Sequence, residues 1–179
     1  MTWKIDPAHS GITFAAKHMM ITTVRGSLTL ADGQIDFDEN DPARSRVEAR
    51  LDAASINTGV PSRDAHLRSA DFLETERFPD IGFRSTRIEP AGRGRFRIIG
   101  ELTIRDVTRP VKLDVRMEGV VPDRQGGRRA AFSASTTINR EDFGLTWNVA
   151  LEQGGWLVSK EIKVEIELAA VEAAQAAAA

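Results

Sequence analysis

Several long stretches of the chain alternate between apolar and polar residues. From Trp156 to Leu168 the even positions are apolar except Lys160, and the odd positions from Ser159 to Glu167 are all polar. The segments 111–121 and 96–104 show the same alternation. A period of two places successive side chains on opposite sides of a β-strand and does not fit a helix. The sequence therefore predicts three long strands, each with one apolar and one charged face.

Shorter or less regular alternation predicts further strands near residues 10–19, 23–30, 33–38, 45–53, 80–88, 129–138 and 145–151. Turn-forming residues separate these segments, among them Asp32-Gly33 and Gly154-Gly155. Residues 106–110 are few enough to join two of the long strands as a hairpin. The chain thus reads as strand, turn and strand, with little between.

One segment, residues 62–72, has helical composition. Ser62 is placed as an N-cap, and Asp64 is favourable in the first turn of a helix. We expect a short helix inside a long connection. Residues 169–179 are rich in alanine and have no apolar pattern to pack with, so we expect a disordered tail or frayed helix after a single domain of residues 1–168.

So many strands with one apolar face must either be covered by another layer or close on themselves. One short helix cannot cover them. A two-sheet sandwich remains an alternative, but the long strands run to about 11–13 residues against a typical five or six. The sequence therefore favours an all-β fold, an extended, closed, eight-stranded antiparallel barrel with one short helix in a connection.

The interior of such a barrel is either filled by side chains or just wide enough for one small ligand. If the apolar faces point inward, Gly100, Gly119, Ala16 and Ala134 leave space beside the larger side chains. An alternative explanation for the glycines is equally good, namely that they relieve strain where a barrel strand bends. A lumen walled by strands of this length is a tube roughly 30 Å tall, which suits a long, thin apolar molecule.

Composition narrows the class of protein. A chain of 179 residues is long enough for one domain with a sizeable core, and the absence of cysteine excludes disulfides and thiolate chemistry. The formal net charge of −2 gives no general attraction to nucleic acid or to an anionic membrane. No apolar stretch approaches the roughly 20 residues that span a bilayer. The first residues, Met1 to Pro7, lack the features of a secretory signal, so we expect a cytoplasmic protein.

The three histidines, His9, His18 and His66, have no metal-ligand spacing and no carboxylate cluster near them in sequence. We therefore expect no metal and no cofactor. His9 and Ser10 follow Asp6-Pro7 at the entrance to a strand, where side-chain to backbone hydrogen bonds would fix a turn.

Arg63, Asp64 and His66 lie close together in sequence, but no nucleophile with an adjacent base and no serine elbow accompanies them. We expect them to anchor the ends of the helix and predict no catalytic residue. In the turn from Asn139 to Gly144, Arg140 and Asp142 are expected to brace the loop.

The predicted ligand contacts lie on the inward faces and at the ends of the barrel. His18 shares a face with Phe14 and Ala16, where it would donate to a ligand head group or meet solvent. Lys160 interrupts an apolar face, so it reaches the rim, lies at a bulge or pairs with an anionic group, for which a pyrophosphate-bearing prenyl ligand is one candidate. The predicted lumen residues are Phe14, Ala16, His18, Leu28, Phe83, Gly100, Leu102, Leu113, Val115, Met117, Phe132, Phe143, Trp147 and Lys160.

Several segments, in this order and spacing, resemble the YceI-like family from Trp3 to Leu168. They are Trp3-Lys4-Ile5-Asp6 with His9-Ser10 and Ile12-x-Phe14, Ile56-Asn57-Thr58-Gly59 with Arg63-Asp64-x-His66-Leu67 and Asp71-Phe72, Phe78-Pro79-x-Ile81-x-Phe83, Gly100-x-Leu102-Thr103-Ile104 with Val107-Thr108-Arg109-Pro110-Val111, and Ile138-Asn139-Arg140-x-Asp142-Phe143-Gly144.

The resemblance implies a lipocalin-like barrel that holds an isoprenoid or similar long-chain lipid in its lumen, often as a homodimer. Arg105-Asp106 departs from the family, which commonly has a small residue or glycine there, so that hairpin is expected to differ in shape. Members of the family are often periplasmic, which contrasts with the cytoplasmic location expected from the N-terminus.

The leading hypothesis is a non-enzymatic carrier or store of a polyprenyl chain, a prenyl quinone or its precursor. An enzyme acting on a lipid or acyl substrate is the first alternative, and it requires a convergent acid, base or nucleophile. A packed barrel that serves as an interaction module is the second, and it requires a filled lumen.

Overall fold

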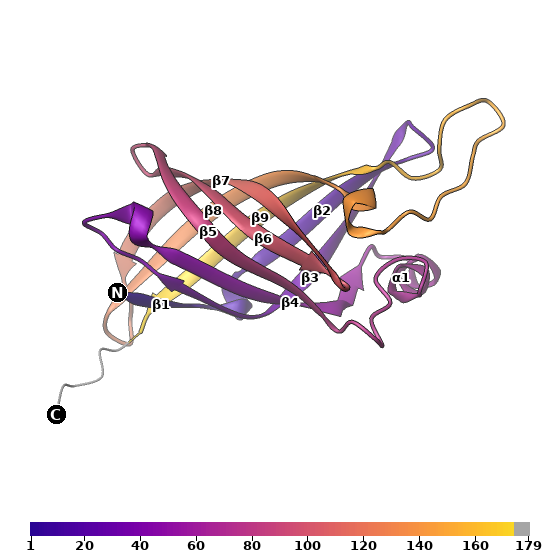
Figure 1. The fold of residues 1–179 in the computed structure, drawn as a ribbon. Helices are drawn as coiled ribbons and strands as arrows, with labels where there is room; N and C mark the ends of the chain where they lie inside the picture. The colour runs from indigo at the N-terminus through magenta and orange to yellow at the C-terminus, as the bar shows by residue number, and fades with distance from the viewer. Residues whose placement is uncertain (174–179) are drawn as a thin grey trace.

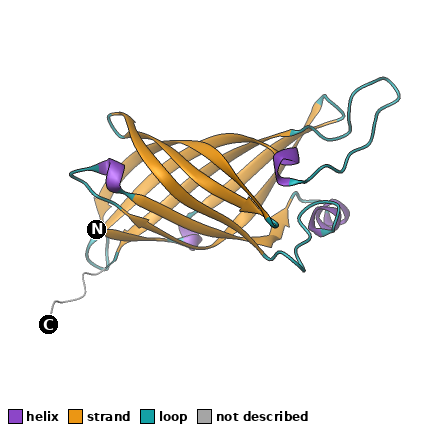
Figure 2. Ribbon diagram, in the orientation of Figure 1, coloured by secondary structure: helices purple, strands orange, loops and turns teal. Residues whose placement is uncertain are grey.

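The computed structural model describes residues 1–173 and confirms the all-β fold. One α-helix, three 3-10 helices and nine strands occur in this part of the chain (Figures 1 and 2). The strands are β1 (Thr2–Ile5), β2 (Gly11–His18), β3 (Thr22–Asp36), β4 (Arg46–Asn57), β5 (Asp80–Gly92), β6 (Arg95–Ile104), β7 (Val107–Pro122), β8 (Arg128–Asn139) and β9 (Glu161–Glu172), and the helices are α1 (Pro61–Arg68), η1 (Pro7–His9), η2 (Pro42–Arg44) and η3 (Arg140–Phe143).

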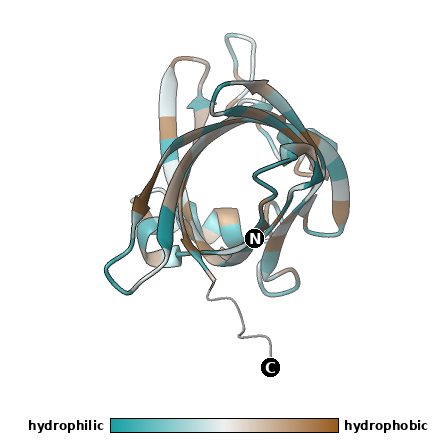
Figure 3. Cartoon of the chain, turned by 90° about the vertical axis from the view of Figure 1, so that its left-hand side faces the viewer, coloured by the Kyte–Doolittle hydropathy of each residue, from teal (hydrophilic) through white to brown (hydrophobic). Residues whose placement is uncertain are grey.

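The strands form a closed antiparallel barrel with eight positions. Neighbours follow the order β2, β9, β8, β7, β6, β5, β4 and β3, and β3 returns to β2. Figure 3, a view along the barrel, shows these strands as a ring. The predicted eight-stranded antiparallel barrel is therefore confirmed, with β1 as an additional strand.

Strand β1 shares the position of β2. Trp3 pairs with Ile35 of β3 and with Glu172 of β9, while further along the same two strands Phe14 pairs with Gly26 and with Val164. Strands β1 and β2 are thus two pieces of one broken strand.

Polar contacts hold the break between β1 and β2. The Asp6 carboxylate accepts hydrogen bonds from the Ala8 backbone N–H at 3.0 Å and from Arg129 at 2.8 Å, and it lies 2.8 Å from Nδ1 of His9. The Ser10 hydroxyl donates to the Asp6 carbonyl at 2.7 Å and accepts from the Ala169 N–H at 3.1 Å. These bonds confirm the turn expected here.

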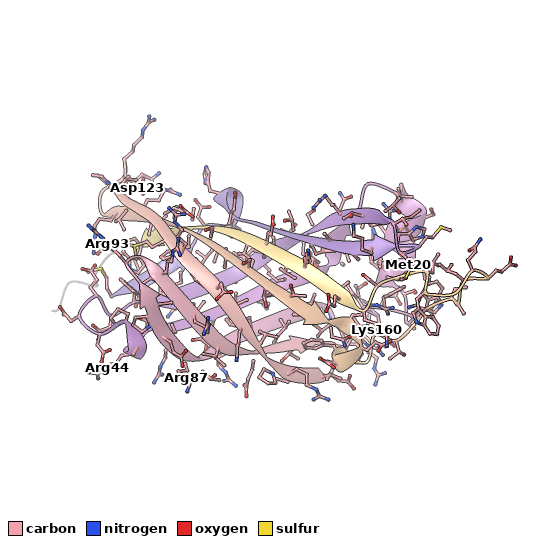
Figure 4. All side chains as sticks on the ribbon, turned by 90° about the horizontal axis from the view of Figure 1, so that it is seen from above. Met20, Arg44, Arg87, Arg93, Asp123 and Lys160 are labelled. Atoms are coloured by element: carbon pink, nitrogen blue, oxygen red, sulfur yellow. The ribbon has the colours of Figure 1, made fainter. Side chains whose placement is uncertain are left out.

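The apolar faces of the long strands point into the barrel, as predicted. Alternate residues of β7 from Val111 to Val115, and of β9 from Ile162 to Leu168, line its interior. Charged residues between them face outward, where pairs such as Arg97 and Asp114 lie across neighbouring strands. Figure 4 shows many of the charged side chains extending from the outside of the barrel.

The turn predicted at Asp32-Gly33 is wrong, because β3 continues through both residues as one strand. A Cβ on Gly33 would lie 2.6 Å from Cδ1 of Ile5. The glycine therefore admits the Ile5 side chain where β1 lies against β3. A register shift between Leu30 and Asp32 marks a local irregularity instead of a turn.

The strand predicted at residues 145–151 is also wrong, and β9 begins at Glu161 instead of Trp156. Residues 144–160 form an irregular excursion whose two arms are joined by the isolated bridge between Ala150 and Trp156 and by side-chain hydrogen bonds of Asn148 to the Val158 backbone. Its alternation reflects burial of Leu145 and half-burial of Trp147 at the end of the barrel, with no strand ladder.

Three boundaries also differ from the sequence prediction. Ala169 to Glu172 continue β9, with Ala170 fully buried against Trp3 and Ile5, so the prediction of a tail from residue 169 is wrong for these residues. Ala173 is also described and donates its N–H to the Thr2 carbonyl, whereas residues 174–179 of the predicted tail lie outside the described residues. Helix α1 starts at Pro61 and ends at Arg68, because proline suits the first helical position and the Ser69 hydroxyl caps the His66 carbonyl.

The hairpin between β6 and β7 turns at Arg105-Asp106, earlier than predicted. Arg105 has a φ of 57°, in the left-handed region that glycine adopts readily. Its guanidinium donates to the Phe72 carbonyl at 3.3 Å and to Glu74 at 3.1 Å. This arginine therefore ties the turn to the segment after α1.

Among the described residues, no helix is long and apolar enough to cross a membrane.

Candidate functional site

The barrel encloses a lumen with two neighbouring sections. The inner section has a volume of about 160 Å³ and the outer section about 500 Å³. Side chains that line both sections show that they meet inside the barrel; these are Ile12, Leu51, Ile81, Leu102, Ile138 and Val164. The outer volume falls in the range of roughly 300–1,000 Å³ that small-molecule sites occupy.

The inner section is apolar. None of its lining residues within the described chain is charged, and Ser45 and Thr136 are its only hydroxyl-bearing residues there. Phe37, Phe83, Phe96 and Phe132 supply the aromatic surface. This section can hold hydrocarbon but offers little to orient a polar group.

The outer section reaches the end of the barrel beside α1, the β2–β3 turn and residues 144–160, which we call the mouth (Figure 1). Its lining includes Lys17, His18, Arg63, His66 and Arg140. No Asp or Glu of the described chain lines it. The mouth is therefore rich in hydrogen-bond donors and basic groups, whereas the inner lumen is not.

Arg140 is the most deeply buried charged residue of the mouth, with 3% of its surface exposed. Burial lowers the pKa of its guanidinium. The guanidinium donates to four backbone carbonyls of the 144–160 segment, at Leu145 (2.7 Å), Trp147 (2.9 Å), Ser159 (2.8 Å) and Val158 (3.3 Å). No carboxylate of the described residues forms an ion pair with it, so its hydrogen bonds go to backbone carbonyls, and its guanidinium lies over the Phe72 ring, 6.0 Å from the centroid.

An aromatic cluster joins α1 to the 144–160 segment at the mouth. The His66 ring packs edge-on against Trp147, with centroids 4.5 Å apart, and against Phe72 at 5.1 Å. Nε2 of His66 lies 2.8 Å from the Asp71 carboxylate, which fixes the ring. All three rings line the outer section, so the cluster supplies apolar surface at the mouth.

A second polar group lies where β4 leads into α1. The buried Asp64 carboxylate accepts from the Thr58 hydroxyl at 2.5 Å and from its N–H at 2.8 Å, and these bonds lower the pKa of Asp64. The Thr58 hydroxyl in turn accepts from Nε of Arg63 at 2.7 Å. Thr58 and Asp64 thus hold Arg63 beside the mouth.

Two glycines make room for aromatic rings that lie along the wall. A Cβ on Gly26 would clash with the Phe14 ring, and one on Gly100 would clash with the Phe83 ring. Ring and glycine lie against each other in both cases, so the rings take less space from the lumen. This agrees with the prediction that small residues favour a cavity, although Gly119 is exposed at a register shift in β7.

Ten of the predicted ligand-contact residues line the lumen, and their binding role stays a prediction. Phe83, Leu113, Val115 and Phe132 line the inner section, and Leu102 lines both. Those of the outer section are Phe14, Ala16, His18, Leu28 and Trp147.

The structure places the other four away from the lumen lining. Gly100 is covered by the Phe83 ring, and Met117 lies toward the opposite end, where its N–H bonds to the Gly94 carbonyl. Phe143, 2% exposed, packs in the core beside the mouth. Lys160 is half-exposed outside the lumen lining with its ammonium 3.3 Å from Glu141, so it reaches the rim and pairs there with an anionic group of the protein.

Sequence reasoning missed the position of Arg140 in the lumen wall and that of Arg63 at the mouth. Both were expected to brace local structure, which they also do. A lone arginine after a strand gives no sign of burial, because its carbonyl partners come from the 144–160 segment. No signal in the sequence marks its burial, since Glu141 and Asp142 directly follow it as possible partners.

Comparisons with known proteins agree with this geometry. A family model described as YceI-like domain matches residues 3–170. A UPF0312 protein of Serratia proteamaculans is 38% identical over 146 residues, which is 80% of this chain and 76% of that protein.

Solved structures share the fold. The YceI protein of Campylobacter jejuni is 30% identical with a TM-score of 0.72, and the match covers 88% of this chain and 90% of that one. A polyisoprenoid binding domain of Saccharophagus degradans is 15% identical with a TM-score of 0.67, and the match covers 96% and 98% of the two chains. Given the family match over nearly all of the described residues and these relatives, the chain belongs to the YceI-like family.

Proposed function

We propose that this protein binds a long-chain isoprenoid lipid in the barrel lumen and stores or transports it without changing it chemically. The ligand is a polyprenyl chain, a prenyl quinone or a precursor of one. The observation that carries the proposal is a lumen whose inner section is uncharged and whose basic groups, among the described residues, all lie at the mouth. Such a site matches a molecule with a long apolar chain and a single polar end.

Apolar contact alone gives enough affinity for this role. Burial contributes about 0.8 kcal/mol for each CH₂ group removed from water. Ten such groups give roughly 8 kcal/mol before ordering costs, which corresponds to micromolar binding. The uncharged wall has few polar groups that could discriminate between apolar chains, so lipids of similar length are expected to compete for the lumen.

The donors at the mouth support a head group with acceptor oxygens. His18 is half-buried there, and within the described residues its ring makes no hydrogen bond. Arg63 lines the same section and has donors beyond the two that Thr58 uses. Lys160, which the sequence suggested as a partner for an anionic head group, forms an ion pair with Glu141 instead.

The polar groups of the mouth support a binding role without catalysis. The Thr58 hydroxyl donates to Asp64 and accepts from Arg63, so its proton is held by a carboxylate that is a weak base. His66 is engaged by Asp71, and its ring packs on Trp147. These contacts position α1 and the mouth. The likeness to a domain described as polyisoprenoid binding points the same way.

Native mass spectrometry of the purified protein, followed by solvent extraction, tests the proposal. We expect a bound prenyl lipid, or uptake of added prenyl quinone at one molecule per barrel. Ala16→Phe fills the outer section and should weaken uptake at least about tenfold. Ala15→Phe is the matched control, since Ala15 lies on the opposite face of β2 and should leave uptake unchanged. Failure to take up any prenyl lipid would refute the proposal.

Two further predictions accompany this function. Sedimentation velocity tests the homodimer that the family resemblance implies, and fractionation of cells tests the cytoplasmic location. Neither is needed for the lumen to hold its ligand.

A further inference from the structure

Exposed apolar side chains gather at the mouth. Nine large apolar residues of the described chain are strongly exposed, and six of them lie in loops at this end; they are Met19, Met20, Ile21, Val60, Val149 and Trp156. Ile21 is 80% exposed and Met20 63%. None of the six lines the lumen. Their position is therefore not explained by ligand binding or by packing of the core.

The two projecting loops of this group are joined to each other. The Met19 N–H donates to the Leu157 carbonyl at 2.8 Å, and the Ser159 N–H donates to the Lys17 carbonyl at 3.0 Å. The Met20 side chain lies on Gly155, where an added Cβ would be 3.0 Å from its Sδ. The β2–β3 turn and the loop of residues 149–156 thus project together, with Glu152 and Gln153 as exposed polar residues in the second loop. We call the exposed side chains of Met19, Met20, Ile21, Val149 and Trp156 the apolar tip.

The turn at the apolar tip is unfavourable for its residues. Met19 and Met20 have φ angles of 51° and 70°, in the left-handed region where glycine or asparagine is preferred. The turn would form more readily with those residues. Folding alone therefore does not account for two methionines and an isoleucine at this position.

The shape of the apolar tip indicates what covers it. Figure 1 shows the two loops projecting beyond the barrel, and Figure 4 places Met20 at the end opposite Asp123. A stable protein interface needs about 800 Å² from each partner and some 20–30 residues on a side. A narrow convex tip offers few residues to a flat or convex protein surface. A bilayer, in contrast, accepts single apolar side chains and favours tryptophan at its interface.

We propose that the apolar tip inserts into the surface of a lipid bilayer and places the mouth against it. The inference rests on the proposed function, since a lipid enters the lumen most directly from a membrane at the mouth. Met19 to Ile21 carry no charge, and the flanking Lys17 is a cation suited to lipid phosphates. Apolar insertion is the main contribution, so the interaction persists in high salt.

Flotation with vesicles of phosphatidylcholine and phosphatidylglycerol tests this inference. We expect the unchanged protein to float with the vesicles at low and high salt. The double variant Met20→Ser, Ile21→Ser should partition at least about tenfold less, because two exposed apolar side chains are lost. The matched control is Val120→Ser, Val121→Ser, since these valines are also exposed (42% and 57%) but lie at the opposite end.

Uptake of prenyl quinone in vesicle-free solution separates this inference from the proposed function. The Met20→Ser, Ile21→Ser variant should keep normal uptake and a normal melting curve. Uptake without flotation of the unchanged protein overturns the docking inference and leaves the proposed function standing. Flotation without uptake refutes the proposed function. Equal loss of flotation in both double variants, or conversion of a dimer to a monomer by the tip variant alone, also overturns the inference.

Discussion

A single buried cation, Arg140, holds the mouth together. Its guanidinium is the common partner of carbonyls at both ends of the 144–160 segment, and the segment has no strand ladder of its own there. A buried acceptor that loses its donor destabilises the folded state by about 1–3 kcal/mol. The position of Trp147 at the mouth therefore depends on a residue that makes its bonds to backbone alone.

Arg140→Met should lower the free energy of unfolding by about 3 kcal/mol, because several carbonyls lose their donor together. It should also expose residues 144–160 to proteolysis before the barrel unfolds. Urea denaturation and limited chymotrypsin digestion measure the two effects, because the segment offers Trp147, Leu151 and Trp156 as cleavage sites in both variants. Lys160→Met is the control, since the exposed pair with Glu141 contributes less than about 1 kcal/mol. Equal effects of both substitutions would contradict this role of Arg140.

The alternation of apolar and polar residues correctly predicts which side chains point into the lumen where the residues lie within a regular strand. Leu102, Leu113 and Val115 line the lumen because neighbours two apart share one face. Lys160 could not be placed in this way, since β9 begins one residue later. Gly100 was on the correct face, but coverage by the Phe83 ring depends on packing across the strands, which a single sequence does not specify.

At the scale of elements, the break between β1 and β2 depends on Asp6. Its hydrogen bonds to Arg129 and His9 lower the pKa of the carboxyl from 3.8 to about 2. The folded protein therefore binds fewer protons at this group than the unfolded chain between these values. The contribution of Asp6 to stability is present above about pH 4 and is lost as the pH falls toward 2.

Asp6→Asn should flatten the dependence of stability on pH in this window. The urea midpoint of the unchanged protein should fall more between pH 5 and pH 2.5 than that of the variant. Asp114→Asn, on the exposed face of β7, should keep the full dependence. An identical pH dependence for Asp6→Asn and the unchanged protein would show that the break is held by other contacts.

Long strands were predictable as elements, whereas the connections were not. Asp-Gly is a common turn pair, yet Gly33 serves close packing of Ile5, and this contact comes from a strand nearly thirty residues earlier. Residues 145–151 alternate, but alternation indicates only burial of one face. A strand also needs a neighbour with free backbone groups, and Arg140 already occupies the carbonyls of Leu145 and Trp147.

At the scale of the whole molecule, lumen and stability are linked. A ligand that binds only the folded barrel at a free concentration of 100 times Kd adds about 2.7 kcal/mol to the free energy of unfolding. For a domain of this size that corresponds to a rise in Tm of roughly 5–11 °C. Prenyl quinone should produce this shift in a thermal melt, and Ala16→Phe should reduce or abolish it. A shift of equal size in the filled variant would indicate binding outside the lumen.

The pairing of β1 with β9 brings both ends of the described chain together. Trp3 lies opposite Glu172, and the Ala173 N–H bonds to the Thr2 carbonyl at 2.9 Å, at the end of the barrel away from the mouth. A short linker could therefore join residues 1 and 173 into a circular chain, and new ends could open at the β5–β6 turn without cutting the lumen wall. The same geometry suits immobilisation, because a protein tethered through residue 1 or residue 173 would present the mouth of the barrel to the solution.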